Sequence, residues 1–131
     1  MSLTIFQIAE EFTFYSAVIS HSYYAIFQSA KAYLISKGVA FSEKQGQHQK
    51  VYYGFKKYVK NGTIDSELLK IYDTVKVKAK ELLEILEKER EERGKSTYET
   101  LPQANKEPAE NSLANAQKFY SNIYYLISKK I

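Results

Sequence analysis

Apolar side chains recur every three or four residues along most of this chain, and strand-like alternation is weak. That spacing places the apolar side chains on one face of a helix. In the first long segment the repeating positions are Phe12, Tyr15, Val18 or Ile19, Tyr23, Ile26 or Phe27, Ala30, and Tyr33 or Leu34. Gly38 is placed to end this helix, because glycine favours the turn that closes a helix. Residues 39–47 are then predicted to form a loop.

Two further helices are predicted in the middle of the chain. The shorter helix has its inner face at Val51, Tyr52, Phe55, Tyr58 and Val59 and ends at Asn61-Gly62. In the next helix, steps of four and three residues join Leu68, Tyr72, Val75, Ala79, Leu82 and Leu86. This heptad-like seam is typical of helices that pack in a bundle at about +20°. Thr63 or Asp65 is expected to cap the helix start by accepting a bond from a free backbone N–H.

The apolar pattern stops after Leu86. Residues 87–95 contain no apolar side chain, so the helix either projects past the core or ends there, with Gly94 as its terminator. Residues 96–108 hold Pro102 and Pro108 among polar residues and are predicted to be an exposed loop before the last helix. That helix has its inner face at Leu113, Ala116, Tyr120, Ile123 and Ile127. The pattern predicts one all-α domain over residues 1–131, an up-and-down antiparallel bundle of four to five helices.

Composition narrows the class of protein. The chain has no cysteine, which removes disulfides, thiolate zinc sites and cysteine nucleophiles and fits an intracellular protein. Residues 1–11 lack the basic start of a secretory signal, so we expect a cytoplasmic location. Residues 12–30 carry no formal charge, close to the roughly 20 residues that cross a bilayer. This stretch is aromatic and interrupted by polar side chains, so a buried helix is predicted, with no membrane contact.

Common catalytic motifs are missing. The sequence has no glycine-rich phosphate loop, no His-Glu-x-x-His helix and no Gly-x-Ser-x-Gly turn. Neither His21 nor His48 has a glutamate three residues before it, as helical di-metal sites require. We therefore expect neither a metal nor a cofactor. The absence of cysteine beside abundant lysine and glutamate is also typical of a thermophile's protein.

Charge is uneven along the chain. The net charge is +4, but residues 31–60 alone hold seven lysines against Glu43. This segment could face nucleic acid, whose phosphates attract basic side chains. Lysines spaced along a helix are more commonly its solvated side. Both interpretations stay open from the sequence.

Both arginines of the chain stand close together, at Arg90 and Arg93, immediately before Lys95 and Tyr98. A guanidinium group binds phosphate through two parallel hydrogen bonds, which an ammonium group does not. These four residues are candidate binding residues for an anionic ligand. The alternative is a solvated helix end, where Glu–Arg pairs contribute roughly 0.2–0.5 kcal/mol each.

Tyrosine is abundant, with 12 residues, and it is concentrated around Tyr23 and Tyr24. Buried tyrosine hydroxyls usually find a partner, so this pair indicates polar contacts inside the fold or across an interface. His21, on the same helix, is interpreted as a partly buried and hydrogen-bonded residue rather than a catalytic base. His48 is interpreted as structural or capping, at the start of the second helix.

These residues resemble a known family. The run Ser-Tyr-Tyr-Ala-Ile-Phe-x-x-Ala-x-Ala-x-Leu at residues 22–34, preceded by His21, is similar to HEPN domains. The residues of this helix taken as characteristic are His21, Tyr23, Tyr24 and Phe27. The later run His-x-x-Val-x-x-x-Phe at residues 48–55 and the pair Arg93 and Tyr98 follow in the matching order. The resemblance covers residues 12–127 and is strongest to a compact archaeal and bacterial branch associated with small nucleotidyltransferases.

The resemblance implies a helical bundle that forms homodimers and pairs with a small nucleotidyltransferase in toxin–antitoxin systems. Many members are metal-independent ribonucleases with an Arg-x(4–6)-His motif, but no histidine follows Arg90 or Arg93 at that spacing. Arg93 and Tyr98 match an arginine–tyrosine variant of the motif. We therefore predict a dimeric module that binds a nucleotide or RNA, or that pairs with a nucleotidyltransferase. The alternatives are a ribonuclease that uses His48 or Tyr98 with Arg93, and a helical scaffold without a ligand.

Overall fold

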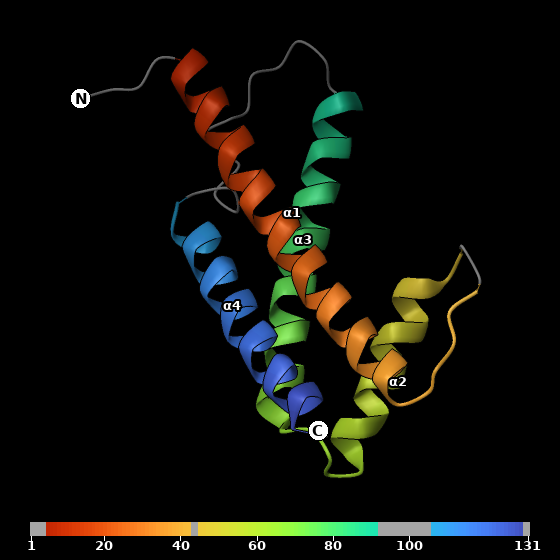
Figure 1. The fold of residues 1–131 in the computed structure, drawn as a ribbon. Coiled ribbons are helices and arrows are strands. Elements are labelled where there is room, and N and C mark those ends of the chain that lie inside the picture. The colour runs from red at the N-terminus through yellow and green to blue at the C-terminus, as the bar shows by residue number, and fades with distance from the viewer. Residues whose placement is uncertain (1–4, 43–44, 92–105, 130–131) are drawn as a thin grey trace.

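The structure is a computed structural model that describes residues 5–42, 45–91 and 106–129. These residues form four α-helices and no strand (Figure 1). The helices are α1 (Ile5–Ser36), α2 (Gln47–Lys60), α3 (Ser66–Glu91) and α4 (Lys106–Ser128). The predicted all-α bundle is confirmed.

The direction of α3 is opposite to that of the other three helices (Figure 1). Direction therefore alternates from α2 to α3 to α4, but α1 runs the same way as α2 and α4. The predicted up-and-down antiparallel arrangement is thus wrong for α1. The ring of His48 lies 4.1 Å from that of Phe27, and further along both helices the ring of Tyr58 lies 5.5 Å from that of Tyr33. The ten residues between α1 and α2 reach roughly 33 Å when extended, more than the roughly 21 Å length of α2. This segment is therefore long enough for the chain to return towards the middle of α1, so that α2 can run beside α1 in the same direction.

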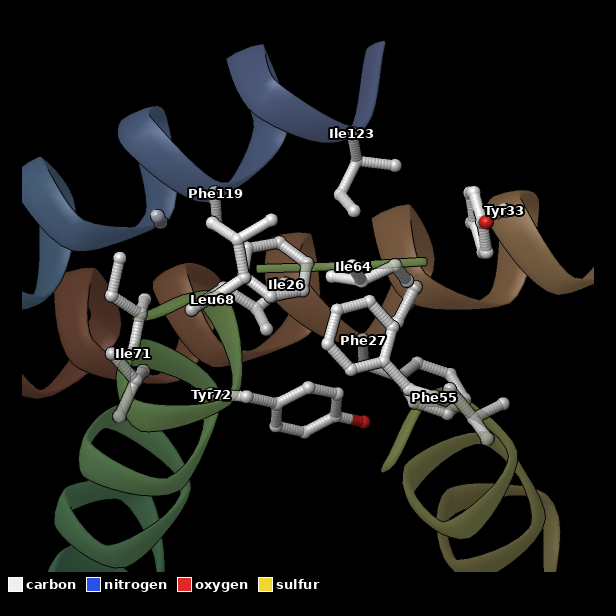
Figure 2. Close-up of a cluster of buried hydrophobic side chains, with 14 of the residues drawn as sticks. Ile26, Phe27, Tyr33, Phe55, Ile64, Leu68, Ile71, Tyr72, Phe119 and Ile123 are labelled. Carbon is white, nitrogen blue, oxygen red and sulfur yellow. The ribbon is translucent and has the colours of Figure 1, made fainter. Parts of the chain in front are cut away.

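The core lies where the four helices meet around three aromatic rings (Figure 2). Phe55 of α2 lies 5.2 Å from Phe119 of α4, and Tyr72 of α3 lies 5.7 Å and 5.8 Å from these two rings. Ile26 and Phe27 of α1 pack against them. Buried aromatic rings each remove about 150–250 Å² from water, so this centre makes a large contribution to burial.

The seam predicted on α3 is buried at most of its positions. Leu68, Tyr72, Val75 and Leu82 are all at most 4% exposed. Beyond Leu82 the helix continues to Glu91, so it extends past the last buried residue of the seam that the structure describes. The side chain of Leu86 and the predicted terminator Gly94 lie outside the described residues.

The predicted inner face of α4 is partly wrong. Leu113 and Tyr120 are 46% and 55% exposed, and the buried positions are Ala109, Ser112, Ala116, Phe119 and Ile123. Both sets step by three and four residues, so periodicity alone does not separate them. The buried set includes three small side chains, which let α4 approach its neighbours closely.

The helix ends follow the predicted turn chemistry with two refinements. Gly38 and Gly62 have φ angles of 92° and 86°, a left-handed conformation that favours glycine. Of the two candidate caps, the Asp65 Oδ1 accepts a 2.8 Å bond from the N–H of Glu67. Helix α4 begins at Lys106, so residues 106–108 of the predicted loop form its first turn, where Pro108 displaces no helical hydrogen bond. None of the described helices is long and apolar enough to cross a membrane.

Candidate functional site

The tyrosine-pair segment meets α2 through a tyrosine–histidine contact. The hydroxyl of Tyr23 and the Nδ1 atom of His48 are 3.0 Å apart, in a hydrogen bond whose direction depends on the histidine tautomer. The imidazole also stacks on the ring of Phe27, at 4.1 Å and an interplanar angle of 17°. Burial raises the pKa of Tyr23. His48 thus holds the start of α2 against the middle of α1, which agrees with a structural role. It is not the helix cap, because the N-cap residue of α2 is Gly46.

Two more tyrosines extend this contact towards α3. The ring of Tyr72 lies 6.5 Å from Tyr23 and 5.3 Å from Tyr52. The Tyr52 hydroxyl donates a 2.5 Å hydrogen bond to the carboxylate of Asp73, and this bond raises the pKa of Tyr52 to about 12. Burial raises the pKa of Tyr72 as well. These hydroxyls stay protonated near neutral pH, so they are not anionic bases. Those of Tyr23 and Tyr52 form hydrogen bonds, whereas the buried Tyr72 hydroxyl has no hydrogen-bond partner among the described residues.

Helix α2 carries a basic surface that contains no acid. Its 14 residues hold Lys50, Lys56, Lys57 and Lys60 and neither aspartate nor glutamate. Tyr53 is 64% exposed on the same helix, and its ring meets the ring of Tyr52 edge-on at 5.5 Å. From α3, the Lys76 Nζ lies 3.8 Å from the centre of the Tyr52 ring. We call Tyr53, Lys56, Lys57, Lys60 and Lys76 the lysine face.

The helical position of Arg90 is far along α3 from the tyrosine–histidine contact. Arg90 belongs to the helical part of α3, but its side chain lies outside the described residues, as do Arg93, Lys95 and Tyr98. Arg90 follows Tyr72 by 18 residues, which corresponds to about 27 Å along the helix axis. Because His48 packs at the level of Tyr23 and Phe27, beside Tyr72, it is not close to Arg90 of the same chain.

A second surface, formed by α1 and α4, was not predicted from the sequence. It is a groove of about 470 Å³ whose lining includes Phe14, Ala17, His21, Leu113, Gln117 and Tyr120. We call it the α1/α4 groove. The partly buried position predicted for His21 is wrong, since the residue is exposed at this groove. Tyr24 is also exposed, but its ring lies beside Phe27, at 6.2 Å. The signal for the groove was the apolar stripe of α4 that contains Leu113 and Tyr120, which its spacing had predicted to face the core.

Within the described ranges, no group of three or more histidine, aspartate and glutamate side chains is placed to hold a metal ion. The described residues therefore define an all-α bundle whose distinctive features are surfaces: a basic face with an exposed tyrosine, and an apolar groove. The sequence matches the model of the HEPN domain over residues 4–124, nearly the full chain. The chain belongs to the HEPN domain family. Neither the curated proteins nor the solved structures compared with the chain gave a match.

Proposed function

We propose that this protein is a dimeric HEPN-type module that binds RNA or a nucleotide on the lysine face of α2 and does not cleave it. The observation that carries the proposal is the composition of α2, with four lysines, no acid and a tyrosine that is 64% exposed. A solvated helix side that serves only solubility usually mixes both signs of charge. An acid-free helix beside an exposed ring is instead suited to a polyanion with aromatic bases.

The chemistry of this face fits single-stranded RNA. Lysine ammonium groups neutralise phosphates and release counterions, which makes the affinity fall as salt rises. A base that stacks on an exposed aromatic ring contributes about 1–3 kcal/mol and needs no particular sequence. Tyr53 is placed for that role, because Lys56 and Lys57 follow it by three and four residues and share its side of the helix.

Binding without cleavage is favoured by the positions of the candidate catalytic groups. Cleavage next to a phosphate needs a base and a cationic group at the same place. The Nδ1 atom of His48 is engaged by Tyr23 at 3.0 Å. Within one chain, the helical position of Arg90 lies about 27 Å along α3 from Tyr72, whose ring lies 6.5 Å from that of Tyr23, the tyrosine that contacts His48.

The test is the affinity of the purified protein for a labelled single-stranded RNA, measured by fluorescence anisotropy at two salt concentrations. Tyr53→Ala should weaken binding about 5-fold or more, as expected for the loss of one stacked base. The matched control is Tyr125→Ala, which removes a tyrosine of similar exposure (62%) from α4. The pair Lys56→Glu and Lys57→Glu should abolish measurable binding, while Lys106→Glu on α4 should leave it within about 2-fold. Equal effects of Tyr53→Ala and Tyr125→Ala would contradict the proposal.

The same samples distinguish the alternatives. Release of fragments that end in a 2′,3′-cyclic phosphate, lost in Arg93→Ala, would assign the protein as a ribonuclease. Binding to neither RNA nor ATP, together with co-purification of a small nucleotidyltransferase, would place the function in a toxin–antitoxin pair. Absence of any ligand and of any partner would leave a helical scaffold. The archaeal or bacterial branch and a thermophilic source stay predictions, and a melting temperature near 50 °C would argue against the latter.

A further inference from the structure

We propose that the α1/α4 groove is the surface through which two copies of this chain pair, in a twofold arrangement that places Phe14 of each copy in the groove of the other. The inference rests on the dimeric state included in the proposed function and deepens it by naming the surface. The fold leaves an apolar surface exposed beside its largest helix–helix contact. Helices α1 and α4 make the most extensive helix pair in the molecule, yet large apolar side chains remain in water along their outer side.

The exposed side chains are large enough to matter. Phe14 is 63% exposed, Tyr120 is 55% exposed, and Tyr124, which stacks on Tyr120 at 6.1 Å, is 62% exposed. Leu113 is 46% exposed between them. With about 150–250 Å² per aromatic side chain, these four residues expose on the order of 400 Å². Ala17, Ala25 and the other small lining residues extend the face towards the roughly 800 Å² that each partner buries in a stable complex.

The charge of the groove favours a second copy over a charged partner. None of the described residues that line it is lysine, arginine, aspartate or glutamate. Residues 12–30, which supply its α1 side, carry no formal charge. In a twofold interface the same patch faces itself, so a charge near the axis would meet its own copy. A face without charges avoids this repulsion and offers nothing to an acidic or basic partner.

The shape of the groove fits the same arrangement. From Phe14 to Ala25, its α1 side extends over about 16 Å. Large rings stand at its two ends, Phe14 at one and Tyr120 with Tyr124 at the other, whereas Ala17 and Ala116 lie between them. A twofold axis through the middle, near His21 and Gln117, brings Phe14 of each copy to the Tyr120 end of the groove of the other. The Phe14 ring then packs against Tyr120 and Tyr124 of the partner copy, while the small residues near the axis let the two copies approach closely.

The test is the molar mass of the full chain in solution by light scattering, with folding checked by circular dichroism. The wild type should have a mass of about 30 kDa, twice the 15.2 kDa of one chain. Phe14→Glu and Tyr120→Glu should each give 15.2 kDa with an unchanged helical spectrum. The matched control is Leu83→Glu, on α3, where the wild-type side chain is 57% exposed and outside the groove. This variant should stay at about 30 kDa.

A second measurement does not depend on the effect of a new charge. The chain has no cysteine, so a single introduced cysteine reports only on its own position. His21→Cys, near the proposed axis, should form a disulfide-linked dimer on mild oxidation, because a disulfide needs the two Cα atoms within about 7 Å. Leu83→Cys should not form one under the same conditions.

The outcomes separate this proposal from the proposed function. A dimer that persists in both glutamate variants, or that cross-links through Leu83→Cys only, would overturn the assignment of the groove and leave RNA binding untouched. A monomeric wild type would overturn both the groove and the dimeric state. If that monomer bound neutral phosphatidylcholine vesicles, the groove would be assigned to a lipid surface instead. Loss of the proposed RNA binding with the groove dimer intact would overturn only the proposed function.

Discussion

Gly54 allows a sharp test of how α1 and α2 pack, because two effects of opposite sign compete there. Alanine inside a helix is about 1 kcal/mol more favourable than glycine. At this position, however, a Cβ atom would stand 2.9 Å from Cδ1 and 3.4 Å from Cδ2 of Leu34. Carbon atoms pack best at about 3.5–4.0 Å, and Leu34 is only 1% exposed, so it has little room to move. Overpacking of a core costs about 1–3 kcal/mol. We expect Gly54→Ala to lower the free energy of unfolding by about 1 kcal/mol net.

The assay is unfolding in guanidinium chloride followed by circular dichroism, at one protein concentration because a dimer's stability depends on it. Leu34→Val provides the matching change, since it shortens the side chain that the new methyl group would meet. Leu34→Val alone should lower the free energy of unfolding by about 1 kcal/mol. The double variant with Gly54→Ala should lose less free energy of unfolding than the sum of the two single variants, with a coupling energy of about 1 kcal/mol.

A close approach of α1 and α2 at Gly54 would be contradicted if Gly54→Ala raised the free energy of unfolding by about 1 kcal/mol and showed no coupling to Leu34→Val. Helix propensity would then act alone. In that case α1 and α2 would not approach as closely as the 2.9 Å distance requires.

The helix cap, the tyrosine–aspartate bond and the core of α4 each give a further test. Asp65→Ala should lower the free energy of unfolding by about 1 kcal/mol and Thr63→Ala by less than about 0.5 kcal/mol, because only Asp65 accepts the capping bond; equal losses in urea unfolding would contradict this assignment. The pKa of Tyr52 in the folded protein, about 12, is above the value near 10 in the unfolded chain. The bond from Tyr52 to Asp73 therefore stabilises the fold fully below about pH 10. This contribution is lost as the pH rises through about 12. Ultraviolet titration of wild type minus Tyr52→Phe should show that late ionisation, and Asp73→Asn should move it towards pH 10. Phe119→Ala should lower the free energy of unfolding by about 3–5 kcal/mol, since the ring is fully buried; a loss under about 1 kcal/mol would mean that another face of α4 is buried.

Much of the fold followed from the spacing of apolar residues. The seam of α3 was predictable because Leu68, Tyr72 and Val75 begin a series that steps by four and three residues to Leu82, and most positions between its members are polar. The end of α2 was predictable because glycine at Gly62 permits a backbone conformation that other residues avoid. Helix α4 differed, because Leu113 and Phe119 belong to two apolar stripes of similar quality. Which stripe is buried depends on the neighbours of α4.

The candidate functional residues were also only partly predictable from the sequence. Tyr23 and His48 were each singled out in the sequence, but nothing in it indicated that residues 25 positions apart share a hydrogen bond. The basic character of residues 31–60 was visible as a count, and only the packing of α2 showed that Tyr53 points to solvent beside the lysines. The predicted site around Arg93 and Tyr98 lies outside the described residues and stays a prediction.

The sequence by itself determined the helical class, the main helices and the HEPN resemblance, because these depend on local spacing and on short runs of residues. The tertiary structure decided the direction of α2 beside α1, the buried stripe of α4 and the two surfaces on which the proposals rest. These features arise from contacts between residues far apart in the chain. Ala109, Ser112 and Ala116 show the physical reason: small side chains admit a neighbouring helix, and the large residues of the other stripe are then left exposed on the surface.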